Sequence, residues 1–392
     1  HKKAKPAEVY TKSNIGLVRR TDKNPANTNM ALPGGKGAYN GIRKSGGEAG
    51  RVCPKRRRRR TVREEGTRYM ESMFFFDIPG LRVGHAQDET AATGCTVVVC
   101  EDGAVAGVDV RGCAPGTRET DLLDPRNLVE RIHAVVLAGG SAFGLDAASG
   151  VMELLERRGI GFDVGVTKVP IVCSAVLFDL LCGDWSRRPD REMGRRAAEN
   201  ALDPGYRPAL GSVGAGTGAT VGKFLGNDFA MRGGVGACAY RAGPVSVGAL
   251  IAVNCLGDVM DPETGNILAG AWDREKRVFR GTEDAVIAAL GEKKNIFAGN
   301  TTIGVVATNA RLTKAQAGKF ASMSHDGYAR SMRPSHTMVD GDTIFALSTG
   351  DVGADLNALG ALASRAVEEA VADAVRSARG GYGFPSVADI GR

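Results

Sequence analysis

Apolar residues in this chain gather in short β-branched runs that alternate with stretches of helical spacing. Runs of this length between glycine-rich connections predict strands, which we place at residues 96–100, 104–110, 133–138, 245–253, 302–308 and 342–347. Apolar positions at helical spacing predict helices, which we place at residues 145–158, 192–202, 284–290, 314–332 and 355–378. The alternation of both kinds of element predicts a layered α/β domain.

The composition is that of a globular chain whose charge is unevenly spread. The 392 residues are 43% hydrophobic and include 54 glycines, so the chain is long and apolar enough to bury a sizeable core. Residues 1–69 carry 19 lysines and arginines against five acidic residues, a net charge of +14. The net charge of +7 for the whole chain therefore leaves −7 for residues 70–392.

We expect residues 1–69 to be a basic disordered tail, because Lys55–Arg60 lies in a stretch without hydrophobic periodicity. Such a run could bind nucleic acid or an acidic membrane surface. No periodic helix or aromatic platform accompanies it. We therefore favour a translated upstream region outside the native fold, with Met70 or Met73 as the natural start, and expect no nucleic-acid or membrane partner.

The cysteines and histidines give no sign of a metal or of a disulfide scaffold. The eight cysteines form no CxxC pair and mostly lie in apolar runs, which indicates buried thiols in a reducing compartment. No apolar run is long enough to span a bilayer, and the basic start lacks the apolar core of a secretion signal. We expect a cytoplasmic protein without metal or cofactor, in which His85, His325 and His336 are structural because no acid partner is visible for a triad.

The segment Asn300-Thr301-Thr302 precedes a β-branched strand and carries a candidate nucleophile. If the bond between Asn300 and Thr301 were cut, Thr301 would hold its hydroxyl nucleophile and a free α-amine on one residue. An α-amine with a reference pKa of about 8 is a working base near neutral pH. The alternative is ordinary turn chemistry before a strand.

A pair of acidic residues follows forty positions later. Asp340 and Asp342 are two apart at the start of an alternating apolar run, and such residues point to the same face of an extended strand. The two carboxylates would then converge and orient a hydroxyl or an ammonium. The alternative is an Asp-Gly turn that opens a hairpin with both acids solvated.

Together these segments resemble the DmpA-like family of self-cleaving N-terminal-nucleophile hydrolases, which includes aminopeptidases, a nylon-oligomer hydrolase and a pantetheine hydrolase. The similarity runs from about Phe76 to Ala378. Its markers follow one another in the family's order: Pro79–His85, Gly112–Asp121, Ala138–Leu145, Gly214–Lys223, Asn300–Thr302 and His336–Asp342. The resemblance implies an α-β-β-α sandwich cut into a large chain, 70–300, and a small chain, 301–392, within a homo-oligomer of four or more copies.

The resemblance also implies roles by position. Thr301 would be the nucleophile and the bond from Asn300 the site of autocleavage, with Asp340 and Asp342 as the acidic pair. Lys223 would be the active-site lysine, and Asn254 would donate a hydrogen bond to the oxyanion. Phe178 would line the substrate pocket where several members have a tyrosine, so a phenolic hydrogen bond is absent here.

The function that this implies is an autoproteolytic threonine amidohydrolase of the aminopeptidase type. It would cleave small peptides, amino-acid amides or nylon-type oligomers through an acyl-enzyme. One alternative is an acyltransferase of the ornithine acetyltransferase type, which would pass the acyl group to an amine in preference to water. A second is a non-enzymatic nucleic-acid binder, whose salt-dependent affinity would vanish without residues 1–69.

Overall fold

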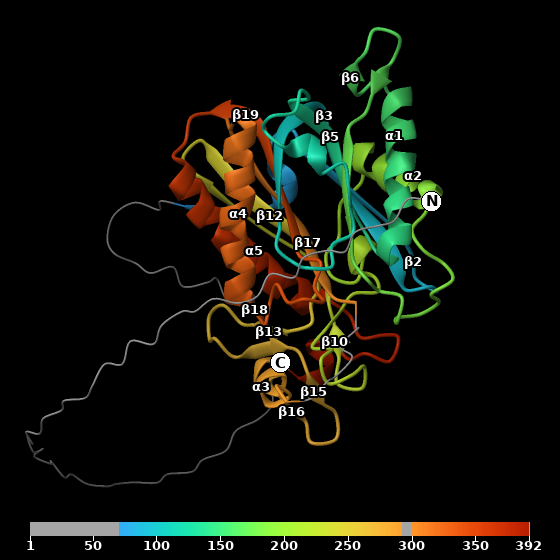
Figure 1. Cartoon of the computed structure of the whole chain (residues 1–392), viewed down its shortest axis with the longest axis vertical. Coiled ribbons are helices and arrows are strands. Elements are labelled where there is room, and N and C mark those ends of the chain that lie inside the picture. The colour runs from blue at the N-terminus through green and yellow to red at the C-terminus, as the bar shows by residue number, and fades with distance from the viewer. Residues whose placement is uncertain (1–69, 292–298, 392) are drawn as a thin grey trace, which may run out of the picture. The chain divides into compact units, whose positions relative to one another are not determined.

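The computed structural model describes residues 70–291 and 299–391, and the predictions made for residues 1–69 lie outside them. Within the described residues, ten strands form one sheet in the order β1-β11-β12-β17-β19-β3-β5-β8-β4, with β2 paired to β3 (Figure 1). Their bounds are β1 Glu71–Met73, β2 Arg82–Asp88, β3 Thr93–Val110, β4 Thr117–Arg118, β5 Arg131–Ala138, β8 Val172–Val176, β11 Gly234–Ala242, β12 Val245–Asn254, β17 Thr301–Ala310 and β19 Thr343–Val352.

Short strands form four further small sheets. They are β6 Phe162–Asp163 with β7 Lys168–Val169, β9 Thr220–Val221 with β10 Met231–Arg232, β13 Asp258–Met260 with β14 Ile267–Ala269 and β18 Met332–Arg333, and β15 Trp272–Asp273 with β16 Val278–Phe279. The α-helices are α1 Ala147–Arg157, α2 Arg191–Leu202, α3 Thr282–Ala288, α4 Lys314–Ser331 and α5 Leu356–Ser377. Short 3-10 helices are η1 Phe75–Asp77, η2 Asp121–Leu123, η3 Ser141–Asp146, η4 Gly214–Gly216 and η5 Ala388–Ile390.

The large sheet folds back on itself, so that its two halves face one another between two helical layers (Figure 1). Alternating residues of β17 and β19 divide between two cores, as the two-residue period of a strand requires. Val306 and Ile344 pack with α4 and α5, whereas Val305 and Phe345 pack against the other half of the sheet. The opposite faces of β3 and β5 form a third core with α1 and α2.

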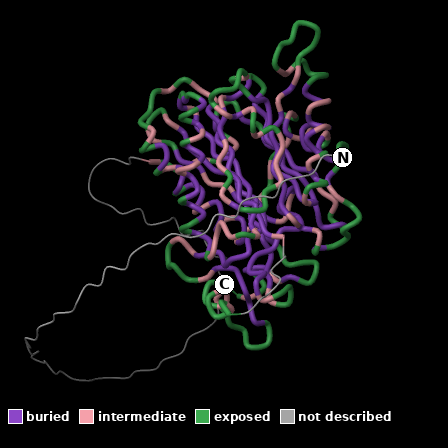
Figure 2. Tube along the Cα trace, in the orientation of Figure 1, coloured by how far each residue is buried: buried purple, intermediate pink, exposed green. Residues whose placement is uncertain are grey.

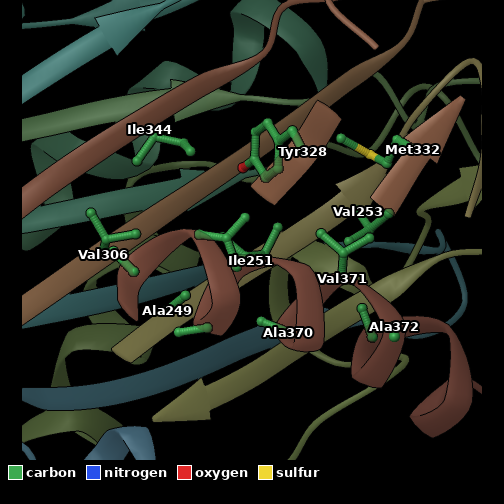
Figure 3. Packing of buried hydrophobic residues seen from close by; sticks show 14 of the residues in the cluster. Ala249, Ile251, Val253, Val306, Tyr328, Met332, Ile344, Ala370, Val371 and Ala372 are labelled. Atoms are coloured by element: carbon green, nitrogen blue, oxygen red, sulfur yellow. The ribbon is translucent and has the colours of Figure 1, made fainter. Parts of the chain in front are cut away.

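The layer order is therefore helix, sheet, sheet, helix, and the predicted α-β-β-α sandwich is confirmed. The structure adds that both sheet layers belong to one hydrogen-bonded sheet, because β3 pairs with β19 in one half and with β2 and β5 in the other. Buried residues run continuously through the two sheet layers (Figure 2). Figure 3 shows the core under α5, where Ala370 and Val371 meet Ala249 and Ile251 of β12.

Two features of the sheet differ from the sequence prediction. The runs at 96–100 and 104–110 are one strand, β3, whose pairing with β5 shifts register between Val99 and Ala104. Strands β2, β8 and β11 were not predicted at all. In β11, Gly236 lies so close to α5 that a Cβ there would be 2.1 Å from the carbonyl oxygen of Ala370. Small residues allow the helix to pack this close to the strand. The strand therefore lacks the β-branched residues from which a strand would be predicted.

Candidate active site

The bond between Asn300 and Thr301 lies at the start of β17, in the middle of the large sheet. Thr301 is opposite Asn254 of β12, and Asn300 forms a one-residue parallel bridge with Asp340. The backbone N–H of Asn300 donates to the Val339 carbonyl at 3.4 Å. Thr301 is only 4% exposed, so the bond is buried, with β12 on one side and the Asp340 segment on the other.

Two donors reach the carbonyl oxygen of Asn300. The backbone N–H of Gly341 donates to it at 3.0 Å, and the Thr301 hydroxyl donates to it from the next residue. The hydroxyl oxygen therefore lies beside the carbonyl of its own peptide bond. A backbone N–H in this place can stabilise the oxyanion that forms when that carbonyl is attacked. Nothing in the sequence alone pointed to Gly341 as the donor, because any non-proline residue supplies a backbone N–H.

The two predicted acids are buried beside this bond, each 1% exposed. Asp342 accepts the Thr302 N–H on Oδ1 at 2.8 Å, and on Oδ2 it accepts the N–H and the ring Nδ1–H of His336, at 3.0 and 2.9 Å. Asp340 accepts the backbone N–H and the hydroxyl of Thr337 on Oδ2. Its Oδ1 is buried and makes no hydrogen bond within the described residues.

Two effects raise the pKa of Asp340 to about 6: burial, which is the larger, and the negative charge of Asp342. The two carboxylates are therefore close enough for the charge of one to affect the pKa of the other. They precede β19, which begins at Thr343, so the predicted start of a strand at residue 342 is one residue early. Neither acid is solvated, which excludes the simple hairpin-turn alternative.

The start of the Gly112–Asp121 segment, together with the residue before it, holds the backbone of the acidic pair in place. The backbone N–H of Ala114 donates to the Asp340 carbonyl at 2.9 Å, and that of Arg111 donates to the Asp342 carbonyl at 3.0 Å. Gly112 is required by space, since a Cβ there would lie 2.3 Å from the carbonyl oxygen of Asp340. The loop thus fixes the backbone on which both carboxylates and the Gly341 N–H are mounted.

Lys223 is also buried near the bond, 5% exposed. Its ammonium donates to the backbone carbonyls of Asn254 at 2.9 Å and of Gly299 at 3.3 Å. Burial lowers the pKa of Lys223 to about 8, against the opposing effect of nearby acidic groups that include Asp340. The lysine therefore lies at the segment that leads into the Asn300–Thr301 bond.

The Asn254 side chain is fully buried, and both of its ends are occupied in the uncut chain. Its Oδ1 accepts the Thr220 N–H at 3.0 Å, and its Nδ2 donates to the Phe178 carbonyl at 3.0 Å. The structure therefore places Asn254 beside Thr301, but its amide donates to Phe178 rather than to the carbonyl of Asn300. Phe178 itself packs close to Gly299, where an added Cβ would be 2.1 Å from the ring.

The space next to the bond is nearly filled. A cavity of about 10 Å³ is lined by Phe178, Lys223 and Gly299, among others. This is about the room of a single water molecule. A larger hollow of about 840 Å³ is lined by Phe143, Arg188 and neighbouring residues, and none of the predicted site residues lines it.

The expectation that His336 has no acid partner is wrong. Its ring Nδ1 is 2.9 Å from Asp342 Oδ2. The two residues are only six apart, but the contact needs a left-handed backbone at His336, with φ at +57°, which the sequence pattern did not reveal. For His325, the ring Nε2 is 3.0 Å from the Asp109 carbonyl.

Among residues 70–291 and 299–391, no three His, Cys, Asp or Glu side chains are grouped as metal ligands. The seven cysteines in these ranges are free thiols, and Cys95, Cys100, Cys173, Cys182 and Cys255 are buried. No helix in the described part of the chain is both long and apolar enough to cross a membrane.

Solved structures share this fold at low sequence identity. A β-aminopeptidase from Burkholderia sp. superposes with a TM-score of 0.57 at 20% identity, covering 81% of this chain and 92% of its own. The L-aminopeptidase D-Ala-esterase/amidase from Ochrobactrum anthropi, described as a variant of the Ntn-hydrolase fold, has a TM-score of 0.55 at 18% identity, covering 78% of this chain and 86% of its own. The fold is therefore that of the Ntn hydrolases.

Sequence relatives are closer. An uncharacterized aminopeptidase of Mycobacterium tuberculosis (strain ATCC 25618 / H37Rv) is 42% identical over 349 residues, 80% of this chain and 96% of its own. A 6-aminohexanoate-oligomer endohydrolase of Kocuria sp. (strain KY2) is 35% identical over 316 residues, 77% of this chain and 85% of its own. The family model of peptidase family S58 matches residues 75–386. The chain belongs to this family and is a hydrolase of peptide or amide bonds.

Proposed function

We propose that this chain is an autoproteolytic amidohydrolase of the aminopeptidase type, with Thr301 as its nucleophile. The observation that carries the proposal is the geometry of one peptide bond. The carbonyl oxygen of Asn300 accepts the Gly341 N–H at 3.0 Å and also the Thr301 hydroxyl. An attacking oxygen and an oxyanion donor thus lie at the same carbonyl.

In the first reaction, Thr301 Oγ attacks the Asn300 carbonyl carbon, and its proton goes to a carboxylate. We assign this base to Asp340, whose Oδ1 has no hydrogen-bond partner among the described residues. The Gly341 N–H stabilises the oxyanion. Collapse breaks the C–N bond, the Thr301 nitrogen leaves as an amine with the transferred proton, and an ester joins Asn300 to Thr301 Oγ. Water then hydrolyses the ester and frees the hydroxyl.

The products would be a large chain that ends at Asn300 and a small chain that begins at Thr301. The new α-amine would then take the hydroxyl proton in each turnover, because about half of an α-amine of ordinary pKa is unprotonated near pH 8. In the uncut chain the adjoining cavity holds only about 10 Å³. Substrate would enter after Gly299, whose carbonyl accepts the Lys223 ammonium, has moved away from it.

For the substrate, the named relatives support amides with an amino-acid acyl group. They comprise an aminopeptidase and a 6-aminohexanoate-oligomer endohydrolase. We propose small peptides, amino-acid amides or ω-amino-acid oligomers as the class. Lys223 would stabilise negative charge on this side of the bond, and Asn254 would become an oxyanion donor once its amide turns from Phe178. A homo-oligomer in the cytoplasm stays a prediction.

The experiment that tests the proposal is a mass measurement on the purified chain beside a Thr301→Ala variant. Two fragments that meet between Asn300 and Thr301, with the variant whole, are expected. A Thr301→Ser variant should still cleave, because it keeps a hydroxyl at the same place. A wild-type chain that stays whole, or a Thr301→Ala variant that is cut at the same bond, would refute the assignment.

A further inference from the structure

His336 holds one carboxylate of the acidic pair with two of its own N–H groups. The backbone N–H donates to Asp342 Oδ2 at 3.0 Å, and the ring Nδ1 lies 2.9 Å from the same oxygen. The left-handed backbone at His336, with φ at +57°, allows both groups to reach one atom. Non-glycine residues adopt this conformation only occasionally, with His, Asn and Asp among the more frequent.

The two contacts from His336 give the two carboxylates different hydrogen-bond surroundings. Asp342 accepts three N–H donors, counting the Thr302 N–H on Oδ1 at 2.8 Å, and these contacts fix the position of both of its oxygens. Asp340 keeps Oδ1 buried and without a partner among the described residues. The carboxylate oxygen without a hydrogen-bond partner is therefore on Asp340, and Asp342 is held in place by its three donors.

The surroundings of the ring indicate which of its nitrogens carries the proton. Nε2 of His336 is buried and has no hydrogen-bond partner in the described part of the chain. A proton on Nε2 would leave an N–H unsatisfied there, which is costly. A proton on Nδ1 meets both conditions, because Nδ1 then donates to Asp342 and Nε2 needs no acceptor.

The aromatic groups that pack against the ring from α4 carry no charge at neutral pH. From α4, the ring centroids of His325 and Tyr328 lie 4.9 and 6.1 Å away. Burial lowers the pKa of His325 to about 4 and raises that of Tyr328, so both are neutral near pH 7. From the acidic segment itself, Asp342 contacts the ring, and Asp109 and Arg111 lie near His325.

We propose that His336 is a positioning residue of the hydrolase, which holds Asp342 in place by hydrogen bonds and so leaves Asp340 as the member of the pair that moves the proton. The inference rests on the proposed function, since it assigns roles within the same reaction. His336 touches neither the scissile bond nor the nucleophile in the contacts described above. Its effect passes through Asp342 to Thr302, the residue that follows the nucleophile.

Two variants separate the ring N–H from the backbone conformation. Both His336→Asn and His336→Gly tolerate a positive φ, but only Asn retains a side-chain N–H near the position of Nδ1. Full-length chains would be made by cell-free synthesis, and autocleavage would be followed by mass spectrometry from pH 5 to pH 9. Melting of each variant in a Thr301→Ala background would show whether the uncut fold is intact.

We expect His336→Gly to cleave about 10- to 100-fold more slowly, the range for losing a hydrogen bond to a charged group. Its rate should also depend differently on pH, because the transferred proton would no longer be confined to Asp340. Added imidazole should restore part of the rate in His336→Gly. His336→Asn should stay within about threefold of the parent, as expected when a donor is retained.

Equal rates and equal pH profiles in the parent and His336→Gly would overturn the inference. Equal losses in both folded variants would also overturn it, since they would assign the effect to ring packing rather than to the N–H. In either case a parent that cleaves at Thr301 leaves the proposed function standing. A parent that stays whole refutes the proposed function, and the inference falls with it.

Discussion

Replacing Lys223 by methionine should make the uncut chain more stable at neutral pH, although the lysine belongs to the site. Lys223 is 5% exposed, and burial lowers its pKa from 10.5 to about 8. At 1.36 kcal/mol for each pH unit, this depression corresponds to a cost of about 3 kcal/mol for keeping the ammonium charged in the fold. Methionine has a similar unbranched shape and no charge to desolvate.

The lost hydrogen bonds offset part of this gain. The ammonium donates to the carbonyls of Asn254 and Gly299, and each such bond contributes about 1 kcal/mol. The net expectation at pH 7 is therefore a Lys223→Met chain that is more stable by about 1 kcal/mol. For a domain of this size that is a rise of about 2 °C in Tm.

The dependence on pH is the sharper signature. Between pH 8 and pH 10.5 the unfolded lysine binds a proton that the folded lysine has lost, so the parent gains stability as pH rises through this window. Lys223→Met should lack that gain of about 3 kcal/mol. Below pH 8 both states of the parent are protonated at this lysine, and the difference between parent and variant should be constant.

The assay is thermal melting at pH 7, 9 and 10 in a Thr301→Ala background, so that every sample is a single uncut chain. Lys314→Met is the matched control, because its buried ammonium also donates to two backbone carbonyls, those of Leu122 and Asn127. It reports the loss of two such bonds away from the acidic pair. A Lys223→Met chain that melts well below the parent at pH 7, by the same margin at pH 10, would refute the reasoning.

Two further predictions concern the bond itself. Gly341→Ala should block autocleavage although its N–H is kept, because the added Cβ would lie 2.8 Å from Thr301 Oγ1. The control is Gly353→Ala, whose added Cβ has no atom within 4 Å. This control should cleave normally by the same mass assay. The rate of autocleavage should rise with pH through about 6 as Asp340 ionises, since its pKa is raised in the fold. Asp340→Asn should cleave at least about 100-fold more slowly and lose that rise in a pH series; a pH profile unchanged from the parent would exclude Asp340 as the base.

The sequence predicted those parts of the molecule that depend on local pattern. Helices α4 and α5 and strands β12, β17 and β19 lie within three residues of their expected ends on most sides, because long periodic runs pack as their spacing requires. The exception at β19 is its end, which extends to Val352. Strand β11 escaped prediction because its small residues serve contact with a helix that is far away in sequence.

The site was predictable only in its side chains with obvious chemistry. Thr301 and the acidic pair carry recognisable groups, and the fold brings them to one peptide bond. The Gly341 N–H and the contact from His336 to Asp342 depend on backbone geometry, including a positive φ, that no residue type specifies. The resemblance placed the amide of Asn254 at the oxyanion, whereas in the uncut chain this amide donates to the Phe178 carbonyl. The residue type alone does not say which acceptor an amide faces.

The central claim is that the chain cuts itself before Thr301 and then uses that residue as its nucleophile. The most direct test is the intact mass of the purified protein beside its Thr301→Ala variant after the same incubation. The account predicts that the wild type gives a fragment that begins at Thr301 and a second that ends at Asn300, while the variant remains one chain. A wild-type chain that keeps its full mass of 41.0 kDa would contradict the account.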